Sequence, residues 1–592
     1  MRLVFSPPAR RDIESGTRHI IPTQERAQDR FLSELAQHTD GIGGVHLLHC
    51  LGQHGIWAFL QEQGSNGATL LRLSRRFGAR LAYLNVVFRV FSAQGWVEWQ
   101  PRRPVENTRV ALGEAGRQLL ELLAGSDAAQ QIVRFLPIAS RLPYHLFGSA
   151  PQPRGIPDLA ELVARNAAGW DLSGADPTIS ERLRLALEGN LVGPVAVALK
   201  DEFHPGWLGA WLERAPRLWQ QPQIAAWASR RQRSRLLDAE ELDLTRLKGQ
   251  RAPLRSAFEL LRDIGWVTLE GDLARLTSKG RYAAPRAWGY GVPVSYLPLF
   301  GQLDSLLFGD HRRVLRQVPG QPERHIQRRI NVKASGASHG RYFAAADEVV
   351  LHAFNLPIHE QPRGFADMGS GDGSWLQHIW ELIRDRTERG RRLREDPPLM
   401  VGLDFNQAAR RATSERLTRA GVPHLVLFGD VNDPDGLRAR LQQHGVDSRD
   451  LLHGSSFLIH NRPYQPPRGP VSDTAISGAY VADGEAIESA DLQQNLIEFF
   501  RAWAAIIGRH GMLAIELHDP ERVIIGKTLS NYILTHGLSE QLTVGITPFL
   551  DAAREAGLEV DPAHQRLFPA ERELATVSVN HFTHRSLPST RK

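Results

Sequence analysis

Residues 364–376 read GFADMGSGDGSWL. The acidic Asp367 lies in a short apolar run, and glycines follow at Gly369, Gly371 and Gly373. These glycines let the backbone pass close to a ligand, because no Cβ atom stands in the way. The spacing differs from the G-x-G-x-x-G of dinucleotide-binding loops. The stretch therefore predicts a strand, a ligand-binding loop and the start of a helix.

From this loop onward, apolar runs alternate with amphipathic stretches. Repeated strand–helix units predict an α/β, Rossmann-like core: a parallel sheet with helices on both faces. Its ligand is expected at the carboxyl ends of the strands, near the point where the strand order reverses. The expected strands are GFADMG (364–369), LMVGLDF (399–405), HLVLFGDV (424–431), DLLHGSSFLIHN (450–461), GMLAIELH (511–518) and ELATVSVNHFTH (573–584).

The pattern acid-x-Gly-x-Gly-x-Gly resembles the end of the first strand in class I S-adenosylmethionine methyltransferases. Asp367 suits the cationic amino-acid part of that cofactor better than a pyrophosphate. Asp404, with Phe405 after it, ends the second expected strand, where a carboxylate can accept hydrogen bonds from both ribose hydroxyls. The resemblance implies that Asp430 and the backbone of Val431, at the end of the third strand, contact the adenine.

Any one of these acids could instead cap a helix or a loop. Three acids in order, each at the end of its own strand, count against that alternative. The loop is therefore interpreted as a cradle for S-adenosylmethionine.

Further segments resemble the C-methyltransferase domains of polyketide synthase loading modules of the apratoxin synthase type. The resemblance implies a mainly helical lid before the core, and one metal ion that assists methylation of malonyl on an acyl carrier protein. No carrier or acyltransferase module is visible in the sequence, so the acceptor stays open. The segments are YGVPVSYLPLFGQLDSLLFGD (290–310), HIQRRINVKASGASHGRYF (325–343) and SSFLIHNRPYQPP (455–467).

Histidines near the expected methyl position are candidates for catalysis. His460 is expected to end the fourth strand, where it could be a general base, a metal ligand or a structural residue. Glu516 and His518 lie two apart on the fifth strand and should share a face. His536 and Gln541, in THGLSEQ, should fold over the same mouth and complete a metal site with His460. Such ligands suit Fe(II), Mn(II) or Mg(II).

Two residues before the core belong to the expected lid. His339 and Tyr342 lie in SGASHGRYF and should face the substrate. The alternative is that this segment is a turn that docks the lid. Both residues are kept as candidate catalytic residues.

One pattern occurs twice before residue 300. VFRVFSAQGWVEW (87–99) and AFELLRDIGWVTL (257–269) each predict a helix and then a strand that opens with Gly-Trp-Val. A second strand and a helix follow each of them, which predicts two winged-helix-like units. The helices before the wings carry few side chains that could read bases. We therefore expect helical packing or homodimerisation rather than nucleic-acid binding.

These patterns predict four domains. A winged-helix-like domain is expected over 1–150, and a second winged-helix-like or helical domain over 151–290. A helical lid should follow over 291–360, and the Rossmann-like S-adenosylmethionine-binding core over 361–592.

Composition narrows the class of protein. The single cysteine, Cys50, argues against an internal disulfide framework and a cysteine-based zinc site. No stretch of about 18 apolar residues and no signal peptide is evident, so a cytoplasmic protein with no membrane partner is expected. The net charge of +6 is small for 592 residues. Basic residues are densest over 311–341, which is either a solvated linker face or a landing site for an acidic partner or a phosphorylated substrate.

The preferred hypothesis is a methyltransferase that C-methylates a malonyl-type thioester. One alternative is O-, N- or S-methylation of a small free metabolite. Another is a DNA-binding regulator that uses S-adenosylmethionine as an effector. Carrier dependence would separate the first two, and salt-dependent duplex binding would reveal the third.

Overall fold

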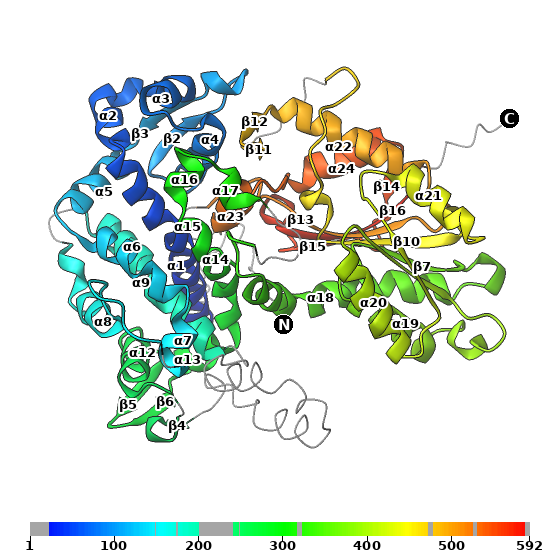
Figure 1. The fold of residues 1–592 in the computed structure, drawn as a ribbon, viewed down its shortest axis with the longest axis horizontal. Helices are drawn as coiled ribbons and strands as arrows, with labels where there is room; N and C mark the ends of the chain where they lie inside the picture. Colours follow the sequence, from blue (N-terminus) through cyan, green and yellow to red (C-terminus); the bar gives the residue numbers. More distant parts are fainter. Residues whose placement is uncertain are drawn as a thin grey trace, which may run out of the picture. The chain divides into compact units, whose positions relative to one another are not determined.

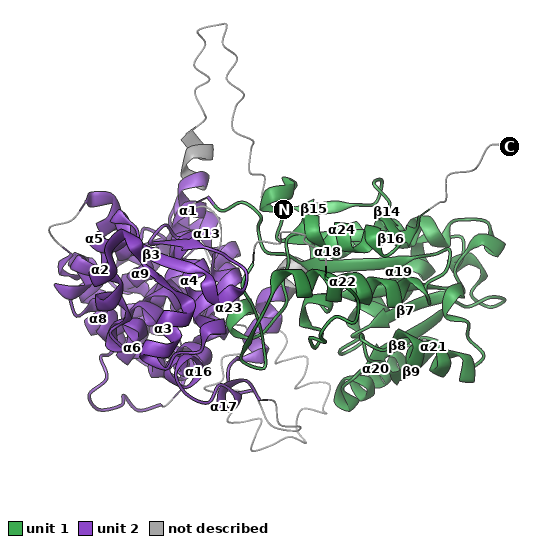
Figure 2. Ribbon diagram, turned by 90° about the horizontal axis from the view of Figure 1, so that it is seen from above, with its two compact units in different colours: residues 1–9, 338–523, 536–592 green, residues 10–337, 524–535 purple. Residues whose placement is uncertain are grey.

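The chain divides into two compact units, which Figure 2 shows in different colours. Unit 1 comprises residues 1–9, 338–523 and 536–592, and unit 2 comprises residues 10–337 and 524–535. The computed structural model of the protein describes residues 23–148, 150–172, 176–200, 241–247, 249–316, 323–471, 478–524 and 530–585.

Unit 1 is built on one eight-stranded sheet. Its strand order is β14-β16-β13-β10-β7-β8-β9, and β15 pairs with β16. The order reverses between β7 and β10, as expected for a doubly wound sheet. The strands are β7 (Gly364–Met368), β8 (Leu399–Asp404), β9 (His424–Phe428), β10 (Leu451–Ser456), β13 (Met512–Leu517), β14 (Leu558–Val560), β15 (Arg566–Phe568) and β16 (Val577–His584).

The sheet differs from the expected parallel arrangement at one edge. Strand β16 runs antiparallel to β13, β14 and β15, whereas β7, β8, β9, β10 and β13 are parallel to their neighbours in that set. A parallel pair needs a long crossover connection. The chain between β14 and β16 holds β15, one turn of 3-10 helix (Arg572–Leu574) and short connections, which is too little for a crossover helix.

Helices cover both faces of this sheet (Figure 1). Side chains alternate along each strand, so that Phe365 packs into the buried cluster on one face and Ala366 into the cluster on the other. The first cluster includes residues of α18 (Arg328–Phe354), α19 (Ser374–Arg386) and α20 (Gln407–Arg419). The second includes residues of α21 (Pro434–Gln443), α22 (Ser489–Ala504) and α24 (Ile546–Glu555).

Unit 2 contains both expected winged-helix-like units. The first has the sheet β1-β3-β2 and the second has the sheet β4-β6-β5. The first consists of α2 (Ile56–Gln63), β1 (Ala68–Thr69), α3 (Leu70–Phe77), α4 (Leu81–Ala93), β2 (Val97–Gln100), β3 (Arg109–Leu112) and α5 (Glu114–Ala124). The described part of the second consists of β4 (Glu241–Asp243), α12 (Arg251–Asp263), β5 (Val267–Glu270), β6 (Leu273–Leu276) and α13 (Ser278–Ala283).

Each of the two winged-helix-like units contains the same close backbone contact. A Cβ atom on Gly116 would lie 2.0 Å from the carbonyl oxygen of Trp96, and one on Gly280 would lie 1.9 Å from that of Trp266. Only glycine fits so near a backbone oxygen, which explains the repeated Gly-Arg after each second strand. Most side chains of α4 are buried. That burial agrees with a structural role, and the absence of nucleic-acid binding stays a prediction.

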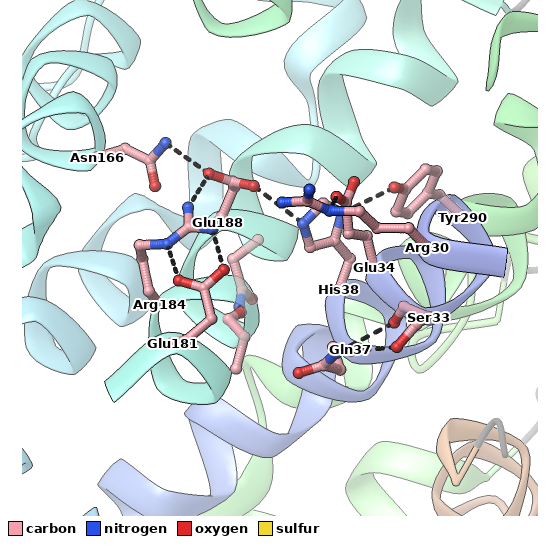
Figure 3. Close-up of polar contacts among 12 residues, drawn as sticks. Arg30, Ser33, Glu34, Gln37, His38, Asn166, Glu181, Arg184, Glu188 and Tyr290 are labelled. Atoms are coloured by element: carbon pink, nitrogen blue, oxygen red, sulfur yellow. Dashed lines mark hydrogen bonds and ion pairs between the residues drawn. The ribbon is translucent and has the colours of Figure 1, made fainter. Parts of the chain in front are cut away.

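Two long helices, α1 (Thr23–Gln53) and α9 (Pro177–Lys200), pack against each other in unit 2. Figure 3 shows a polar network between them, in which the His38 ring lies between Glu188 and the hydroxyl of Tyr290. Its Nε2 is 3.0 Å from Glu188 Oε1 and its Nδ1 is 2.8 Å from the Tyr290 oxygen.

Glu188 is buried and has further donors. Its Oε2 accepts hydrogen bonds from Asn166 Nδ2 at 3.0 Å and from Arg184 Nη1 at 2.7 Å (Figure 3). Burial alone would raise the pKa of Glu188, but His38, Arg184 and Asn166 together lower it to about 2. The carboxylate is therefore ionised and fully paired.

Short helices fill most of the region expected to be a lid: α14 (Gly291–Ser295), α15 (Leu297–Phe300), α16 (Leu303–Leu307) and α17 (Arg312–Leu315). The long α18 then leads into the core. Among the described residues, none of the helices is both long and apolar enough to cross a membrane.

Candidate active site

The glycine loop follows β7, as the sequence predicts. Gly369, Gly371 and Gly373 have φ values of 81°, 56° and 77°, in the left-handed region that favours glycine. The backbone N–H groups of Gly369 and Ser370 donate to the carbonyl oxygen of Leu403, at 2.8 and 3.0 Å. The loop is thereby fixed to the end of β8, the neighbouring strand.

Close packing surrounds two of these glycines. A Cβ atom on Gly369 would lie 3.0 Å from Leu458 Cδ2, and one on Gly373 would lie 3.0 Å from Thr413 Cα. A Cβ atom on Gly371 would meet only a backbone oxygen at 3.9 Å. The middle of the loop is therefore open enough for a ligand to approach its backbone.

Asp367 is a buried carboxylate with an unpaired oxygen. It is 2% exposed, and its Oδ1 has no hydrogen-bond partner among the described residues. Burial, and then the nearby charge of Asp404, raise the pKa of Asp367 well above its ordinary value. A cationic ligand would supply the missing partner, so the site fits the charged amino-acid part of S-adenosylmethionine.

Asp404 ends β8, as predicted, and it links the glycine loop after β7 to the loop after β8. Its Oδ2 accepts a hydrogen bond from the backbone N–H of Gly371 at 3.1 Å, and its Oδ1 accepts one from that of Asn406 at 2.8 Å. Phe405 beside it is 70% exposed, and its ring lies 5.4 Å from that of Phe428. An exposed aromatic ring of this kind can stack on a nucleobase.

Asp430 lies beyond the strand that was expected to end with it. Strand β9 ends at Phe428, and Asp430 Oδ1 then accepts a hydrogen bond from the N–H of Asn432 at 2.9 Å, which closes a turn. Val431 is buried, and its carbonyl oxygen accepts a hydrogen bond from Trp503 Nε1 at 2.9 Å. Asp430 and Val431 therefore sit in a fixed turn just after the carboxyl end of β9.

His460 is not at the end of a strand, contrary to the sequence-based expectation. Strand β10 ends at Ser456, and His460 lies in the short 3-10 helix Ile459–Asn461. Phe457 separates the two elements with a φ of 54°, a left-handed conformation that ends the extended strand. His460 nevertheless lies close to the glycine loop, since Leu458 packs against Gly369.

The partner of His460 is Glu516, near the end of β13. His460 Nδ1 contacts Glu516 Oε1, and both side chains are buried. The backbone N–H groups of Ile459 and Leu517 each donate to the same carboxylate at 2.7 Å. Burial raises the pKa of Glu516, but His460 and these donors outweigh it and hold the pKa below its ordinary value. Sequence reasoning placed Glu516 on the fifth strand but did not pair it with His460, because no local pattern joins two residues that lie 56 positions apart in the chain.

His518, the other residue considered on this strand, is fully paired. Its Nδ1 donates to the carbonyl oxygen of Val544 at 3.2 Å, and its Nε2 accepts from Ser578 Oγ at 2.7 Å. Burial lowers the pKa of His518 to about 4, so its ring is neutral. Strand β13 ends at Leu517, which leaves His518 just outside it.

His536 lies beside His460. It is near the end of α23 (Asn531–Leu538), and the two imidazole rings are 5.9 Å apart and almost perpendicular. The backbone N–H of Leu542 donates to the carbonyl oxygen of His460 at 2.7 Å, which draws the following segment to the same place. Gln541 is held there as well, because its backbone N–H donates to the His536 carbonyl oxygen at 2.9 Å and its Nε2 to Ser539 Oγ at 2.9 Å.

The two expected lid residues lie on α18. Tyr342 is buried, and its ring lies 5.9 Å from that of Phe457 and 5.0 Å from that of Phe568. Its hydroxyl accepts a hydrogen bond from the guanidinium of Arg341. The side chain of His339 lies outside the described residues.

Three domain models match successive parts of the chain. Residues 31–99 match the AprA N-terminal domain, residues 230–310 the AprA winged helix domain, and residues 323–580 the AprA MT2-like domain. No curated protein matches the chain.

Solved methyltransferase structures are also similar in part. N,N-8-amino-8-demethyl-D-riboflavin dimethyltransferase (RosA) from Streptomyces davawensis has 16% identity and a TM-score of 0.33, with 59% of this chain and 91% of that one covered. An O-methyltransferase family protein from Burkholderia thailandensis has 14% identity and a TM-score of 0.33, with 64% and 98% covered. These scores are low, so the identification rests on the domain models and the sheet order. The chain is a class I S-adenosylmethionine-dependent methyltransferase, built from N-terminal, winged-helix and methyltransferase domains of the AprA type.

Proposed function

We propose that this enzyme transfers a methyl group from S-adenosylmethionine to the carbon of a malonyl-type thioester on an acyl carrier protein. His460 is the residue at the reacting centre. The single observation that carries this assignment is the buried contact between His460 Nδ1 and Glu516, next to the glycine loop. That contact leaves Nε2 as the nitrogen that can act on a ligand.

The glycine loop and the three acids hold the cofactor in this proposal. Asp367 pairs with the cationic amino-acid part, and Asp404 accepts hydrogen bonds from the ribose hydroxyls. Phe405 stacks on the adenine, whose edge faces Asp430 and the backbone of Val431. The unpaired Oδ1 of buried Asp367 and the exposed ring of Phe405 support these roles.

The chemistry is an in-line displacement at the methyl carbon. A carbon–carbon bond forms as the bond from sulfur to methyl breaks, and its electron pair stays on sulfur. The acceptor carbon must first lose a proton, which is the step a base or a Lewis acid assists. Glu516 fixes the orientation of the His460 ring for that step.

A divalent ion fits these donors. Metal-binding histidines are commonly oriented by a carboxylate on the other ring nitrogen, which is the arrangement of His460 and Glu516. His460, His536 and Gln541 would hold Fe(II) or Mn(II). A bound ion would supply charge stabilisation for the enolate of the acceptor.

Basic residues in unit 2 support an acidic macromolecular partner. Arg312, Arg313, Arg324 and Arg329 are all exposed. An acyl carrier protein with acidic side chains and a phosphate-linked arm suits such a surface.

One observation favours the second candidate, methylation of a small free metabolite. Among the described residues, neither of the two groups of His, Cys, Asp and Glu whose ligand atoms are close enough to hold a metal ion includes His460. A histidine oriented by a carboxylate is also the arrangement of a general base. In that case His460 would remove a proton from an oxygen, nitrogen or sulfur acceptor without a metal.

Mass spectrometry of the acceptor tests the proposal. Metal-free enzyme, Fe(II)- or Mn(II)-loaded enzyme and EDTA-treated enzyme are each incubated with S-adenosylmethionine and a malonyl-loaded carrier protein. Methylmalonyl carrier should form only with the loaded enzyme. Full turnover in EDTA would reject the metal and favour a general base, and no methylation of the carrier under any condition would reject the thioester acceptor.

A further inference from the structure

A second group of metal-binding side chains lies in unit 1, away from the glycine loop. Asp561 and His564 belong to the turn DPAH between β14 and β15, and His581 lies on β16. One ligand atom from each of the three lies within 4.8 Å of the other two. All three side chains are partly buried.

The turn already holds two of these ligands side by side. His564 Nδ1 lies 2.6 Å from Asp561 Oδ2, and the backbone N–H of His564 donates to the Asp561 carbonyl oxygen at 3.1 Å. The backbone N–H of Asp561 donates to the carbonyl oxygen of His581 at 2.9 Å. The backbone therefore fixes the positions of all three residues before any ligand binds.

His581 carries an unused nitrogen. Its Nε2 donates to the carbonyl oxygen of His510 at 2.8 Å, so that Nδ1 bears the lone pair of the neutral ring. That Nδ1 is buried and has no hydrogen-bond partner among the described residues.

We propose that Asp561, His564 and His581 form a binding site for one divalent transition-metal ion, which joins the β14–β15 turn to β16. Two imidazoles and one carboxylate are a donor set that suits Zn(II). The ion takes the place of the hydrogen bond between His564 Nδ1 and Asp561 Oδ2. His352 of α18, whose ring lies 5.3 Å from that of His564, is a candidate for a fourth position.

This site is separate from the cofactor site. His581 pairs with Leu513 at the amino-terminal end of β13, whereas Glu516, the partner of His460, pairs with Ser578 near the other end. Cofactor-binding residues gather at the carboxyl ends of the parallel strands. The ion therefore contributes to the stability of the sheet edge rather than to methyl transfer.

Zinc binding by the full chain tests the proposal. The metal-stripped protein is titrated with Zn(II) against a chromophoric competitor, and thermal unfolding is followed with and without Zn(II). His564→Gln and His581→Gln should each weaken one zinc equivalent by at least about a hundredfold, because each removes a ligand. Zn(II) should raise the melting temperature of the wild type but not of these variants.

Three variants serve as controls. His444→Gln removes an exposed histidine on the surface of unit 1. Cys50→Ser removes the thiol of the other group with metal-ligand separations, which consists of Cys50, His54 and Asp304. His460→Gln removes the proposed catalytic ligand. All three should keep the equivalent that His564→Gln loses.

Equal zinc affinity and stoichiometry in wild type, His564→Gln and His581→Gln would overturn the proposal. So would the loss of every tight equivalent in His460→Gln or Cys50→Ser. His564 lies in a partly exposed turn, so His564→Gln should fold. This variant therefore tests the site even if His581→Gln does not fold.

Discussion

Two buried histidine–glutamate pairs, one in each unit, differ in how completely their atoms are bonded. In unit 2, both ring nitrogens of His38 have partners, Glu188 and Tyr290. In unit 1, His460 contacts Glu516 through Nδ1, and its Nε2 has no side-chain partner among the described residues.

The carboxylates of both pairs are well satisfied, but by different donors. Side chains of Asn166 and Arg184 complete the shell of Glu188. Backbone N–H groups at positions 459 and 517 complete that of Glu516. Glu188 therefore joins several helices, whereas Glu516 orients one ring at the end of a strand.

The difference shows how a structural pair can be told from a functional one of the same composition. A saturated network stabilises a single packing, since loss of any member leaves a buried group unpaired. A pair with one nitrogen left over, beside a ligand loop, has an atom to offer to a reaction. The same argument separates His518, with both nitrogens bonded, from His581, with one unused.

The largest expected effect is on catalysis. His460→Gln should lower the methyl-transfer rate constant by about 10²–10⁴-fold, because the group that assists proton removal is lost. S-adenosylmethionine affinity, measured by calorimetry, should stay nearly unchanged. His38→Gln is the matched variant, and it should keep the rate constant of any protein that remains folded.

The next effect is on stability. Glu188→Gln should destabilise unit 2 by about 3 kcal/mol, because it leaves the buried ring of His38 without its carboxylate and removes one of the two carboxylate partners of the half-buried Arg184. Urea unfolding followed by tryptophan fluorescence measures this loss. A change below about 0.5 kcal/mol would show that the network does not stabilise the fold.

The pH dependence of that loss follows from the pKa of Glu188. In the folded protein this pKa is about 2, below the ordinary value of 4.5. The ionised carboxylate therefore contributes its full share to the free energy of unfolding above pH 4.5, and this share disappears as the pH falls toward 2. The loss of unfolding free energy caused by Glu188→Gln should therefore be equal at about pH 7.5 and about pH 5.5, and should become smaller below about pH 4.5. A cost that already shrinks between the two higher values would contradict the assigned pKa shift.

A smaller effect is expected at the cofactor cradle. Asp367→Asn should weaken S-adenosylmethionine binding by about 2 kcal/mol, roughly thirtyfold, because a charged partner is lost. Because the pKa of Asp367 is raised, its role can also be tested by the pH dependence of cofactor binding. Binding of the cation requires the ionised carboxylate, so the affinity of the wild type should rise with pH and that of Asp367→Asn should not.

The smallest effect is expected at the ribose position. Asp404→Asn keeps an oxygen for the loop but loses the charge, and it should weaken cofactor binding by about 1 kcal/mol, or fivefold. Calorimetry with both variants ranks the two acids. An Asp404→Asn effect larger than that of Asp367→Asn would reverse the roles assigned to them.

Much of the core could be predicted from local sequence. Strands, glycine loop and Asp404 follow from apolar runs and spacing, because the carboxyl ends of parallel strands meet at one edge. The two winged-helix-like units could also be predicted from local sequence, because Gly-Trp-Val recurs at the start of a strand.

The rest depends on contacts between distant parts of the chain. The pairing of His460 with Glu516 joins a short 3-10 helix to a strand, and the site at His581 joins a turn to a later strand. The left-handed turn at Phe457, which moves His460 off the strand, has no glycine or asparagine to announce it. The antiparallel direction of β16 was missed because a strand's own residues do not show its direction, which depends on its pairing with β13, β14 and β15.

The most direct test of the account is a single-turnover measurement of methyl transfer to malonyl-loaded carrier protein, with S-adenosylmethionine saturating. Wild type and His38→Gln are expected to transfer the methyl group at similar rates, and His460→Gln at least about a hundredfold more slowly. Equal rates in wild type and His460→Gln would contradict the assignment of the pair His460–Glu516 to the reaction.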